Sequence, residues 1–558
     1  MSKSFFQKSL LLFFIPFCFY SNSSAQIGNV TERHPVYPFL KKMQVQGVLK
    51  NYDDFIIPFS REEVNSFLSQ IDSSRNELST SDREFLDRMK DKLSLMNEDR
   101  INLFDEFTGE LIDNLIADKE KHLYHYKDSV IFLYVDPIIE YKFIYSDIVK
   151  SSASLLNYGG VIAGSYNDWF GFYLEGTNGT VFGNRNSASI DKRVEQSFTF
   201  NNTKINFFDG TQGYLRIHKD IFNLQLGRER ILWGRGNLNR MILSDNPPLF
   251  DFIKIDLSYK SLKYDFIHAW LIQPKISVFV DSLSGEIRNK PAKYLAVSRL
   301  SFTPNENISF GVSQAIIYAN RPFEAAYLNP FLVWESAQRS LNDLDNSFLS
   351  LDGRYKMING LEFNSAILID DIHFGKLFKN WATIHNRIAW QVGAMITSPL
   401  SFDDLTLKFE YLQIRPYIFI HPGLGESLTY TNNTYLLGFD LPPNSIRLSA
   451  ELGYRLSGRM NITLRYDHSL HGNNIYDKDE KLVRNVGANI YENNTISDPE
   501  TAHLLDGDRE LTDYVSINYV YEFLYGFYLE AEYQFRRNVL MEKKTLQNIL
   551  WGSVGINF

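Results

Sequence analysis

The stretch Tyr-Gly-Phe-Tyr-Leu-Glu-Ala-Glu-Tyr-Gln-Phe, residues 525–535, decides the fold. Apolar and polar side chains alternate along it, so an extended chain would present one apolar face and one largely polar face. The run is about as long as the 9–11 residues that a tilted strand needs to cross a bilayer. It is therefore typical of the wall of a transmembrane barrel. The apolar face carries Tyr525, Phe527, Leu529, Ala531, Tyr533 and Phe535, and the other face carries Gly526, Tyr528, Glu530, Glu532 and Gln534.

The same two-residue period recurs from about residue 130 onward, in stretches such as 170–175, 446–455 and 462–467. A soluble β-sandwich would alternate too, but here the polar face is charged in strand after strand, and the last strand ends on Phe558. A final strand with a terminal aromatic resembles the signal read by the outer-membrane barrel-assembly machinery, so we expect that machinery as a partner. The pattern predicts an all-β transmembrane barrel of about 18 antiparallel strands.

Residues 26–125 have a helical period and predict a small N-terminal α-helical region. Ser60 and Glu63 form a capping box, and residues 81–84 repeat it. A weaker helical pattern lies at 103–117. Amphipathic helices must bury their apolar faces, so we expect a small periplasmic bundle or a plug at the barrel mouth.

Residues 1–25 have the pattern of a secretory signal peptide. Lys3 and Lys8 precede an apolar run over 10–20, and small residues end at Ala25, where we expect cleavage. The one cysteine lies inside the apolar run, without the small residues that a lipoprotein cleavage point needs. We therefore expect neither a lipid anchor nor a disulfide in the exported chain.

The predicted organisation is a signal peptide over 1–25, a periplasmic helical region over 26–125 and a barrel over 126–558 in the outer membrane of a Gram-negative bacterium. Removing the two lysines of the signal peptide lowers the formal charge from −9 to −11. An acidic chain is a poor match for phosphates, so no nucleic-acid partner is expected. Aromatic residues make up 15% of the chain, which fits aromatic girdles in contact with outer-membrane lipid.

The first distinctive segment is Leu-Gly-Arg-Glu-Arg-Ile-Leu-Trp-Gly-Arg-Gly, residues 226–236. Trp233 and Arg235 suit a sugar site in a lumenal loop, because tryptophan stacks on sugar rings and arginine binds carboxylates. The alternative, which we favour, is structural: the arginines pair with lumenal carboxylates such as Glu530 and hold the barrel rigid. These arginines are Arg228, Arg230 and Arg235.

Two further segments are distinctive. Residues 415–421 read Arg-Pro-Tyr-Ile-Phe-Ile-His and offer Arg415, Tyr417 and His421 as polar or stacking groups for sugars. Residues 327–331 read Tyr-Leu-Asn-Pro-Phe. Both segments lie in the part of the chain that is predicted to form the barrel.

In their order along the chain, 226–236, 327–331 and 415–421, the three segments resemble the capsule assembly protein Wzi family, in the long form with an N-terminal helical region. The resemblance spans most of the predicted barrel. It implies an 18-stranded barrel with a helical bundle, which binds capsular polysaccharide at the cell surface as a lectin. The chain departs from the family at 442–444, with Pro-Pro-Asn for Gly-Pro-Asn, and at 233–236, with Trp-Gly-Arg-Gly for Trp-Gly-Pro-Gly. The additional arginine changes the charge of the lumen.

The long connection over 470–511 is the main candidate for a surface loop. If the last strand ends in the periplasm, the alternation of turns places this connection outside the cell, and it is too long for a plain turn. Tyr476 and Tyr491 could stack on sugars, and Asn493 could exchange hydrogen bonds with hydroxyls.

Signs of enzymatic or metal chemistry are poor. The sequence has no nucleophile elbow, zinc-helix motif or phosphate loop. Asp-His at 467–468 could act with the carboxylates of 403–404 or 370–371 only if they met in space, and polar strand ends are the plainer interpretation. Carboxylates at 477–479 and 506–508 could contribute to a calcium site, but neither has complete loop spacing, so no cofactor is expected.

We therefore expect a non-enzymatic surface protein that binds or organises exported capsular or extracellular polysaccharide. The alternatives are a porin-like channel for oligosaccharides and a surface-adhesion or gliding-motility barrel. The candidate polysaccharide-binding residues are Trp233, Arg235, Tyr476, Tyr491, Asn493, Arg415, Tyr417 and His421.

Deleting Phe558 should lower the amount of assembled barrel in outer-membrane fractions far more than deleting one residue of an interior loop. The reason is the position of this aromatic ring on the alternating face of the final strand, which it shares with Val554 and Ile556. Heat-modifiability on gels separates folded from unfolded protein. Unchanged folded levels after the truncation would count against the assembly role of Phe558.

Overall fold

The computed structural model describes residues 28–558 with short gaps, so the predicted signal peptide lies outside the described residues. Within the described part, no helix is both long and apolar enough to cross a membrane. The gaps are 94–99, 105–110, 168, 202–204, 274–276, 282–284, 290, 330, 344, 373–374, 376–379, 422–424, 494 and 496–497.

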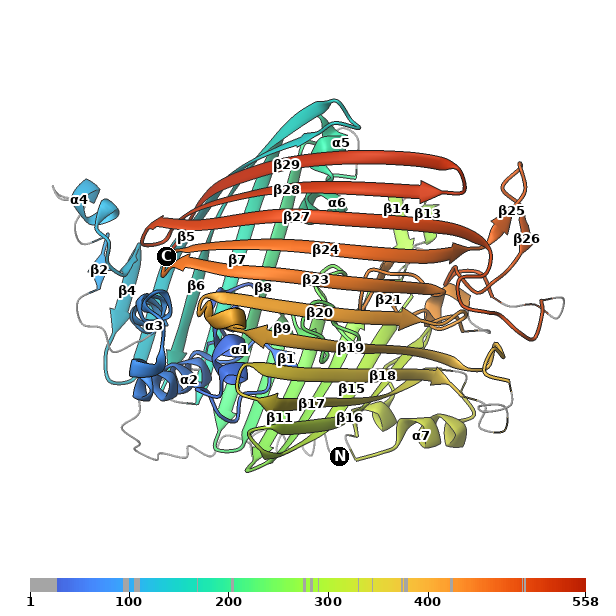
Figure 1. Cartoon of the computed structure of the whole chain (residues 1–558), viewed down its shortest axis with the longest axis horizontal. Helices are drawn as coiled ribbons and strands as arrows, with labels where there is room; N and C mark the ends of the chain where they lie inside the picture. The colour runs from blue at the N-terminus through green and yellow to red at the C-terminus, as the bar shows by residue number, and fades with distance from the viewer. Residues whose placement is uncertain are drawn as a thin grey trace, which may run out of the picture.

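Eighteen antiparallel strands among the described residues close into one barrel (Figure 1), which confirms the predicted fold. The barrel closes where the last strand pairs with the first, with Trp551 opposite Ile144. A short strand, β4 (Tyr124–Lys127), continues this pairing along the first strand. The wall strands are β5 (Ile131–Ser146), β6 (Ser151–Tyr166), β7 (Phe170–Gly183), β8 (Phe207–Lys219), β9 (Phe222–Arg228), β11 (Asp251–Tyr259), β12 (Leu262–Leu271), β15 (Lys293–Asn305), β16 (Ile308–Ala319), β17 (Asn346–Ile358), β18 (Leu361–Asp371), β19 (Arg387–Thr397), β20 (Leu405–Ile414), β23 (Ser445–Ser457), β24 (Met460–Asn473), β27 (Asp508–Leu524), β28 (Phe527–Leu540) and β29 (Lys543–Asn557).

The two ends of the barrel differ. At the short-turn end, on the left of Figure 1, tight turns such as 458–459 and 525–526 join the strands, and the C-terminus lies there. At the long-loop end, on the right, lie the long connections 415–444 and 474–507. These connections carry short elements of their own, among them β21 (Thr431–Asn432), β22 (Tyr435–Leu436), β25 (Ile475–Tyr476) and β26 (Leu482–Arg484).

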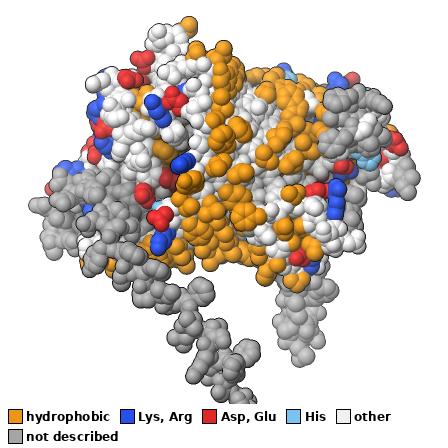
Figure 2. Space-filling model, turned by 90° about the horizontal axis from the view of Figure 1, so that it is seen from below, with side chains coloured by type: hydrophobic (Ala, Val, Ile, Leu, Met, Phe, Trp, Pro, Cys, Tyr) orange, Lys and Arg blue, Asp and Glu red, His pale blue; other side chains and the backbone are white. Residues whose placement is uncertain are grey.

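The stretch 525–535 forms a wall strand, but this strand begins two residues later than its alternation predicts. Gly526 has a positive φ of 77° and forms the turn, where a Cβ would lie 2.5 Å from the ring of Phe558. Beyond the turn the predicted faces hold: the Tyr533 side chain is exposed on the outer face, whereas Glu530 accepts a hydrogen bond of 2.8 Å from Asn518. Figure 2 shows the exposed apolar side chains gathered in a band between two charged ends.

The N-terminal region packs as a helical plug against the short-turn end. Its helices are α1 (Val36–Gln46), α2 (Arg61–Ser73) and α3 (Thr80–Leu93), followed by the short α4 (Leu111–Ile116). The apolar faces of α1, α2 and α3 share one buried core, whereas Ile112 and Ile116 of α4 are exposed. Backbone and side-chain contacts join this region to the wall turns, since Gly360 donates to the Val45 carbonyl and Asp404 accepts from Ser79 at 2.6 Å.

One predicted capping box is confirmed and the other is wrong. Ser60 caps α2, with both reciprocal hydrogen bonds to Glu63 present. At the second site Ser79, two residues earlier, accepts from the Asp82 backbone N–H at 3.1 Å, and α3 begins at Thr80. Ser81 lies inside the helix, where its hydroxyl bonds to Asp404 of the barrel wall. Ser79 and Ser81 both donate to Asp404 in the turn before β20, which fixes the start of α3 two residues earlier than the local pattern predicts.

Candidate functional site

The segment after β9 turns inward and fills the lumen. Its strand β10 (Leu232–Trp233) pairs with β1 (Ile56–Ile57) of the helical plug. Trp233 is fully buried in the largest apolar core of the described residues, which also takes in inward-facing wall residues and the loop over 417–441. The indole therefore has no face open to a sugar in this structure.

Arg235 joins three parts of the molecule. Its guanidinium lies 2.5 Å from Asp53 of the plug and 2.8 Å from Asp352 of β17. Arg299 of β15 shares the same Asp352 carboxylate at 2.9 Å. Both guanidinium groups stack on the ring of Phe55, with centroid distances of 4.9 and 3.7 Å. We call these five residues the plug cluster.

The electrostatics of the plug cluster favour the charged forms. Burial raises the pKa of the Asp53 carboxyl, but Arg235, Arg299 and Arg354 outweigh burial and hold that pKa well below its usual range. Burial lowers the pKa of Arg235, and the Asp53 and Asp352 carboxylates more than reverse this, so the net shift is upward. The cluster is thus a buried network of ion pairs that binds the plug to the wall.

A second buried ion pair supports the same contact. Lys41 of α1 lies 2.5 Å from Glu362 of β18 and 3.2 Å from Asp54. The Glu362 side chain is fully buried. Charged groups with so little access to water hold a fixed geometry, because a buried charge that loses its partner is costly.

The other two arginines of 226–236 occupy different environments. Arg228 makes a bidentate pair with Asp251 at 2.8 and 2.9 Å on the outer face of the wall, where both side chains are about half exposed. Arg230 donates to the Pro247 carbonyl at 2.8 Å. Arg230 also lies 3.7 Å from the Glu32 carboxylate. The expected pairing with lumenal carboxylates therefore holds for Arg235, which binds Asp352, and is wrong for Arg228; the named partner Glu530 accepts from Asn518 instead.

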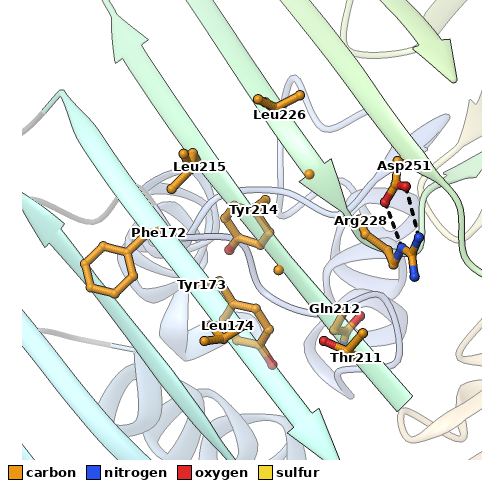
Figure 3. A pocket seen from close by; sticks show the side chains of 12 residues that line it. Phe172, Tyr173, Leu174, Thr211, Gln212, Tyr214, Leu215, Leu226, Arg228 and Asp251 are labelled. Atoms are coloured by element: carbon orange, nitrogen blue, oxygen red, sulfur yellow. Dashed lines mark hydrogen bonds and ion pairs between the residues drawn. The ribbon is translucent and has the colours of Figure 1, made fainter. Parts of the chain in front are cut away.

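A groove of about 700 Å³ lies on this outer face, over β7, β8 and β9 (Figure 3). Apolar side chains dominate its lining, and the Arg228–Asp251 pair stands at one end. Arg228 is already paired with Asp251, so the groove presents mainly apolar surface. Its apolar lining includes Phe172, Leu174, Leu215 and Leu226.

Residues 415–421 tie the long loops together. Arg415 is buried and donates to the carbonyls of Asn386 and Trp381 at 2.9 and 2.8 Å. Tyr417 is also buried, and its hydroxyl donates to the Asn485 carbonyl at 3.0 Å. His421 lies partly exposed at the end of the segment. Two of the three candidate binding residues of this segment thus face protein rather than solvent.

The exposed candidates lie on the connection over 474–507. Tyr476 is 40% exposed, with its hydroxyl donating to Glu492 at 2.9 Å. Tyr491 is half-buried, and its hydroxyl donates to the Thr434 carbonyl at 3.3 Å. Asn493 is partly exposed, and its carbonyl accepts from Asn485.

The sequence analysis missed Trp381. This side chain is 45% exposed, and its ring lies over the Arg415 guanidinium at 4.9 Å. Its loop joins the neighbouring one, since Ala502 donates to the Ala382 carbonyl. The available signal was a lone tryptophan in the polar stretch Lys-Asn-Trp-Ala-Thr, residues 379–383.

The aspartates of 370–371, 403–404 and 467–468 do not meet in one site, because each group has different partners. His468 lies 2.8 Å from Asp513, whereas Asp404 binds Ser79 at the short-turn end. Asp370 accepts from the Phe419 backbone N–H at 2.7 Å. The carboxylate of Asp477 accepts from two backbone N–H groups of its own turn. Within the described ranges, no group of three His, Cys, Asp or Glu side chains is placed to hold a metal ion.

The geometry defines a closed barrel with a helical plug at one end and interlocked loops at the other. The model of the capsule assembly protein Wzi family matches residues 147–542. The chain therefore belongs to the Wzi capsule assembly family, as the three sequence segments predict.

Solved structures agree with the fold. Wzi from Escherichia coli, an outer-membrane protein described as a carbohydrate-binding β-barrel of group 1 capsule assembly, has 11% sequence identity and a TM-score of 0.57, covering 95% of this chain and 99% of its own. OprD from Pseudomonas aeruginosa has 12% identity and a TM-score of 0.42, covering 76% of this chain and 94% of its own. None of the curated proteins compared with the chain matches it.

Arg235→Ala should destabilise the folded protein by about 3–5 kcal/mol, because it leaves the Asp53 and Asp352 carboxylates buried without their shared partner. The measurement is thermal unfolding followed by heat-modifiability on gels. Arg75→Ala is the matched control, since Arg75 makes a comparable bidentate pair with Asp87 in solvent and should leave the midpoint nearly unchanged. Equal midpoints for both variants would refute the structural role of the plug cluster.

Acid should weaken the plug. The pKa of Asp53 is depressed in the folded protein, so its contribution to stability is present above an unfolded pKa of about 4 and is lost as the pH falls below that value toward the folded pKa. Unfolding midpoints should therefore drop as the pH falls below about 4. The Asp53→Asn variant should have a lower unfolding midpoint at pH 7, and its midpoint should fall less on acidification. An identical acid dependence in the variant would contradict this assignment.

Proposed function

We propose that this protein is an outer-membrane surface protein that binds or organises exported capsular polysaccharide, without enzymatic activity. Membership of the Wzi family and the fold shared with the carbohydrate-binding Wzi barrel support this proposal. The observation that carries it is the long-loop end, where interlocked loops expose aromatic rings and amides above a filled lumen. Sugars are bound in this way, by stacking and by groups that both donate and accept hydrogen bonds.

The proposed binding surface contains the exposed side chains of the long-loop end. We assign Trp381, Tyr476 and Tyr491 to stacking and Asn493 to hydrogen bonding, with His421 at the edge. Trp233, Arg235, Arg415 and Tyr417 are buried, so we give them the supporting role of holding the loops and the plug in place.

The orientation follows from the position of the ends. With the helical plug and the C-terminus in the periplasm, the long-loop end faces outside. Residues 1–25 then act as a signal peptide, 26–125 as the periplasmic helical region and 126–558 as the barrel. Outer-membrane lipid surrounds the apolar band, and the barrel-assembly machinery inserts it.

The negative charge of the long-loop end limits which polysaccharides can bind there. The tip of the connection over 474–507 carries Asp477, Asp479 and Glu480 against Lys478 and Lys481. Other carboxylates, such as Glu492 and Glu500, add to the negative charge. A neutral polymer, or an acidic polymer bridged by calcium, therefore fits better than a strongly acidic polymer alone.

The structure favours binding over transport. An apolar core made by inward side chains of β11 to β20, the segment after β9 and the loop over 417–441 occupies part of the lumen, and the plug packs against the short-turn end. A porin-like channel for oligosaccharides needs a water-filled path, so planar bilayers that contain the protein should show almost no conductance. Steady open-channel currents would favour the channel. A capsule stain of a deletion strain separates capsule assembly from surface adhesion or gliding motility.

Trp381→Ala and Tyr476→Ala should each weaken polysaccharide retention on cells, by up to roughly tenfold in apparent affinity, because one stacking contact contributes about 0.5–1.5 kcal/mol. The matched control is Met541→Ala, an exposed apolar residue in a tight turn at the same end. Retention is measured at equal levels of folded protein. Normal retention in both variants would remove these rings from the binding surface.

A further inference from the structure

The connection between β16 and β17 does not project away from the barrel. Residues 320–345 form a segment that folds back over the outer face of the wall and contains η2 (Ala325–Leu328) and α7 (Trp334–Leu341). We call it the re-entrant segment. It includes the third distinctive motif, 327–331, of which Pro330 lies outside the described residues. Figure 1 shows α7 beside β16 at the edge of the barrel.

The alternation of β12, β15 and β16 shows which face this segment covers. Inward side chains such as Ile267, Leu295 and Ile317 belong to the lumenal core. The alternate side chains face outward, and close to the short-turn end they are exposed, as Leu300 and Val312 are at 54% and 46%. Farther along the same outward rows the side chains are buried. These are Phe266, Tyr294, Ala296, Ile316 and Tyr318.

Two aromatic anchors of the re-entrant segment bury this part of the outer wall. Trp334 packs edge-on against Phe266 at 6.1 Å, and Tyr327 lies 5.1 Å from Tyr318. Both anchors are almost fully buried. The Tyr327 hydroxyl donates to Asp345 at 2.6 Å, which fixes the segment near its return to β17.

Between the anchors, the tip of the segment is exposed. Phe331 is 85% exposed and Val333 is 66% exposed. The Phe331 ring stacks on Tyr264 at 6.4 Å with an interplanar angle of 16°. Tyr264 is paired with Leu300, and Leu300 with Val312, so the tip lies beside an exposed apolar row of the wall. The tip of the re-entrant segment therefore lies within the band of exposed apolar side chains that surrounds the barrel wall.

Several polar groups of the tip are paired within the protein. The Phe331 N–H donates to the Asn329 side chain at 3.0 Å, and the Trp334 indole donates to the Asn329 carbonyl at 3.3 Å. Gln314, a polar residue in the outward rows of β16, accepts from the Trp334 N–H and donates to the Leu332 carbonyl. Backbone at membrane depth requires such pairing, because an unsatisfied polar group in hydrocarbon costs several kcal/mol.

We propose that the re-entrant segment inserts into the lipid of the outer leaflet, with Phe331 and Val333 in contact with acyl chains. Lipid fits better than a protein partner, because the tip continues an apolar wall surface and the backbone groups next to it are bonded to Asn329 and Gln314. The charge closest to the tip, Glu335 in the first turn of α7, is paired within the protein: it lies 2.6 Å from Arg339 one turn later and accepts a hydrogen bond from Ser347 of β17. This inference depends on the barrel crossing a membrane and is independent of polysaccharide binding.

The test uses a single fluorescent label in the exported protein, which has no native thiol once the proposed signal peptide, with Cys18, is cleaved. Phe331→Cys is labelled with an environment-sensitive dye and reconstituted in phospholipid vesicles that contain nitroxide-labelled acyl chains. Val333→Cys is the second variant, in case the first does not fold. Leu300→Cys marks the lipid-facing wall, and Val483→Cys, 65% exposed on β26, marks the aqueous loops.

Quenching of the Phe331 label by acyl-chain nitroxides should match that of the Leu300 label within about twofold, with several-fold less quenching by aqueous iodide than at Val483. Iodide quenching equal to that at Val483 would overturn the proposal. Protection from both quenchers in native outer-membrane fragments would overturn it as well, and would assign the tip to a protein partner instead.

Discussion

Closure of the wall is the constraint on which the rest of this structure depends. In an apolar medium each strand edge must be paired, and only a cylinder whose last strand returns to its first leaves no edge open. The pairing of β29 with β5 provides this closure. A cylinder of 18 strands encloses a wide lumen, which must hold water or be filled. Here the inward side chains and the segment after β9 form an apolar core, and the helical plug covers the short-turn end.

A filled lumen makes the buried charges structural. Arg235, Asp53 and Asp352 come from the inward segment, the plug and the wall, so their ion pairs exist only when all three parts are assembled. Such a network adds little net stability over apolar packing, yet it penalises any arrangement that leaves one charge alone. The arginine in the family's Trp-Gly-Pro-Gly position is therefore best explained as a means of fixing the plug against the wall.

Local patterns predicted what local physics determines. Alternation identified β28, although the predicted stretch began two residues before the strand and ended before Leu540, and the Ser60–Glu63 box marked the start of α2. Contacts between distant residues were not predictable in this way: Arg235 lies 182 residues from Asp53, and Ser81 left its capping role for Asp404, 323 residues away. The position of a loop residue such as Trp381 depends on contacts with other loops, here with Arg415, and these contacts leave no pattern in the local sequence. Burial could not be read from the motifs either, so Trp233 and Tyr417 were assigned to a surface that they do not reach.

The rigid interior suits the proposed binding of polysaccharide by the loops. Arg415 and Tyr417 contact the carbonyls of neighbouring connections, and each is buried where the loops meet. Loops held from below lose less conformational entropy when a ligand binds, so weak stacking and amide contacts suffice for useful affinity. A polymer also offers many identical units, and repeated weak contacts along it multiply by effective concentration. A surface of a few exposed rings and amides on a fixed base is thus better suited to hold a long polysaccharide than a deep pocket, which admits only a chain end.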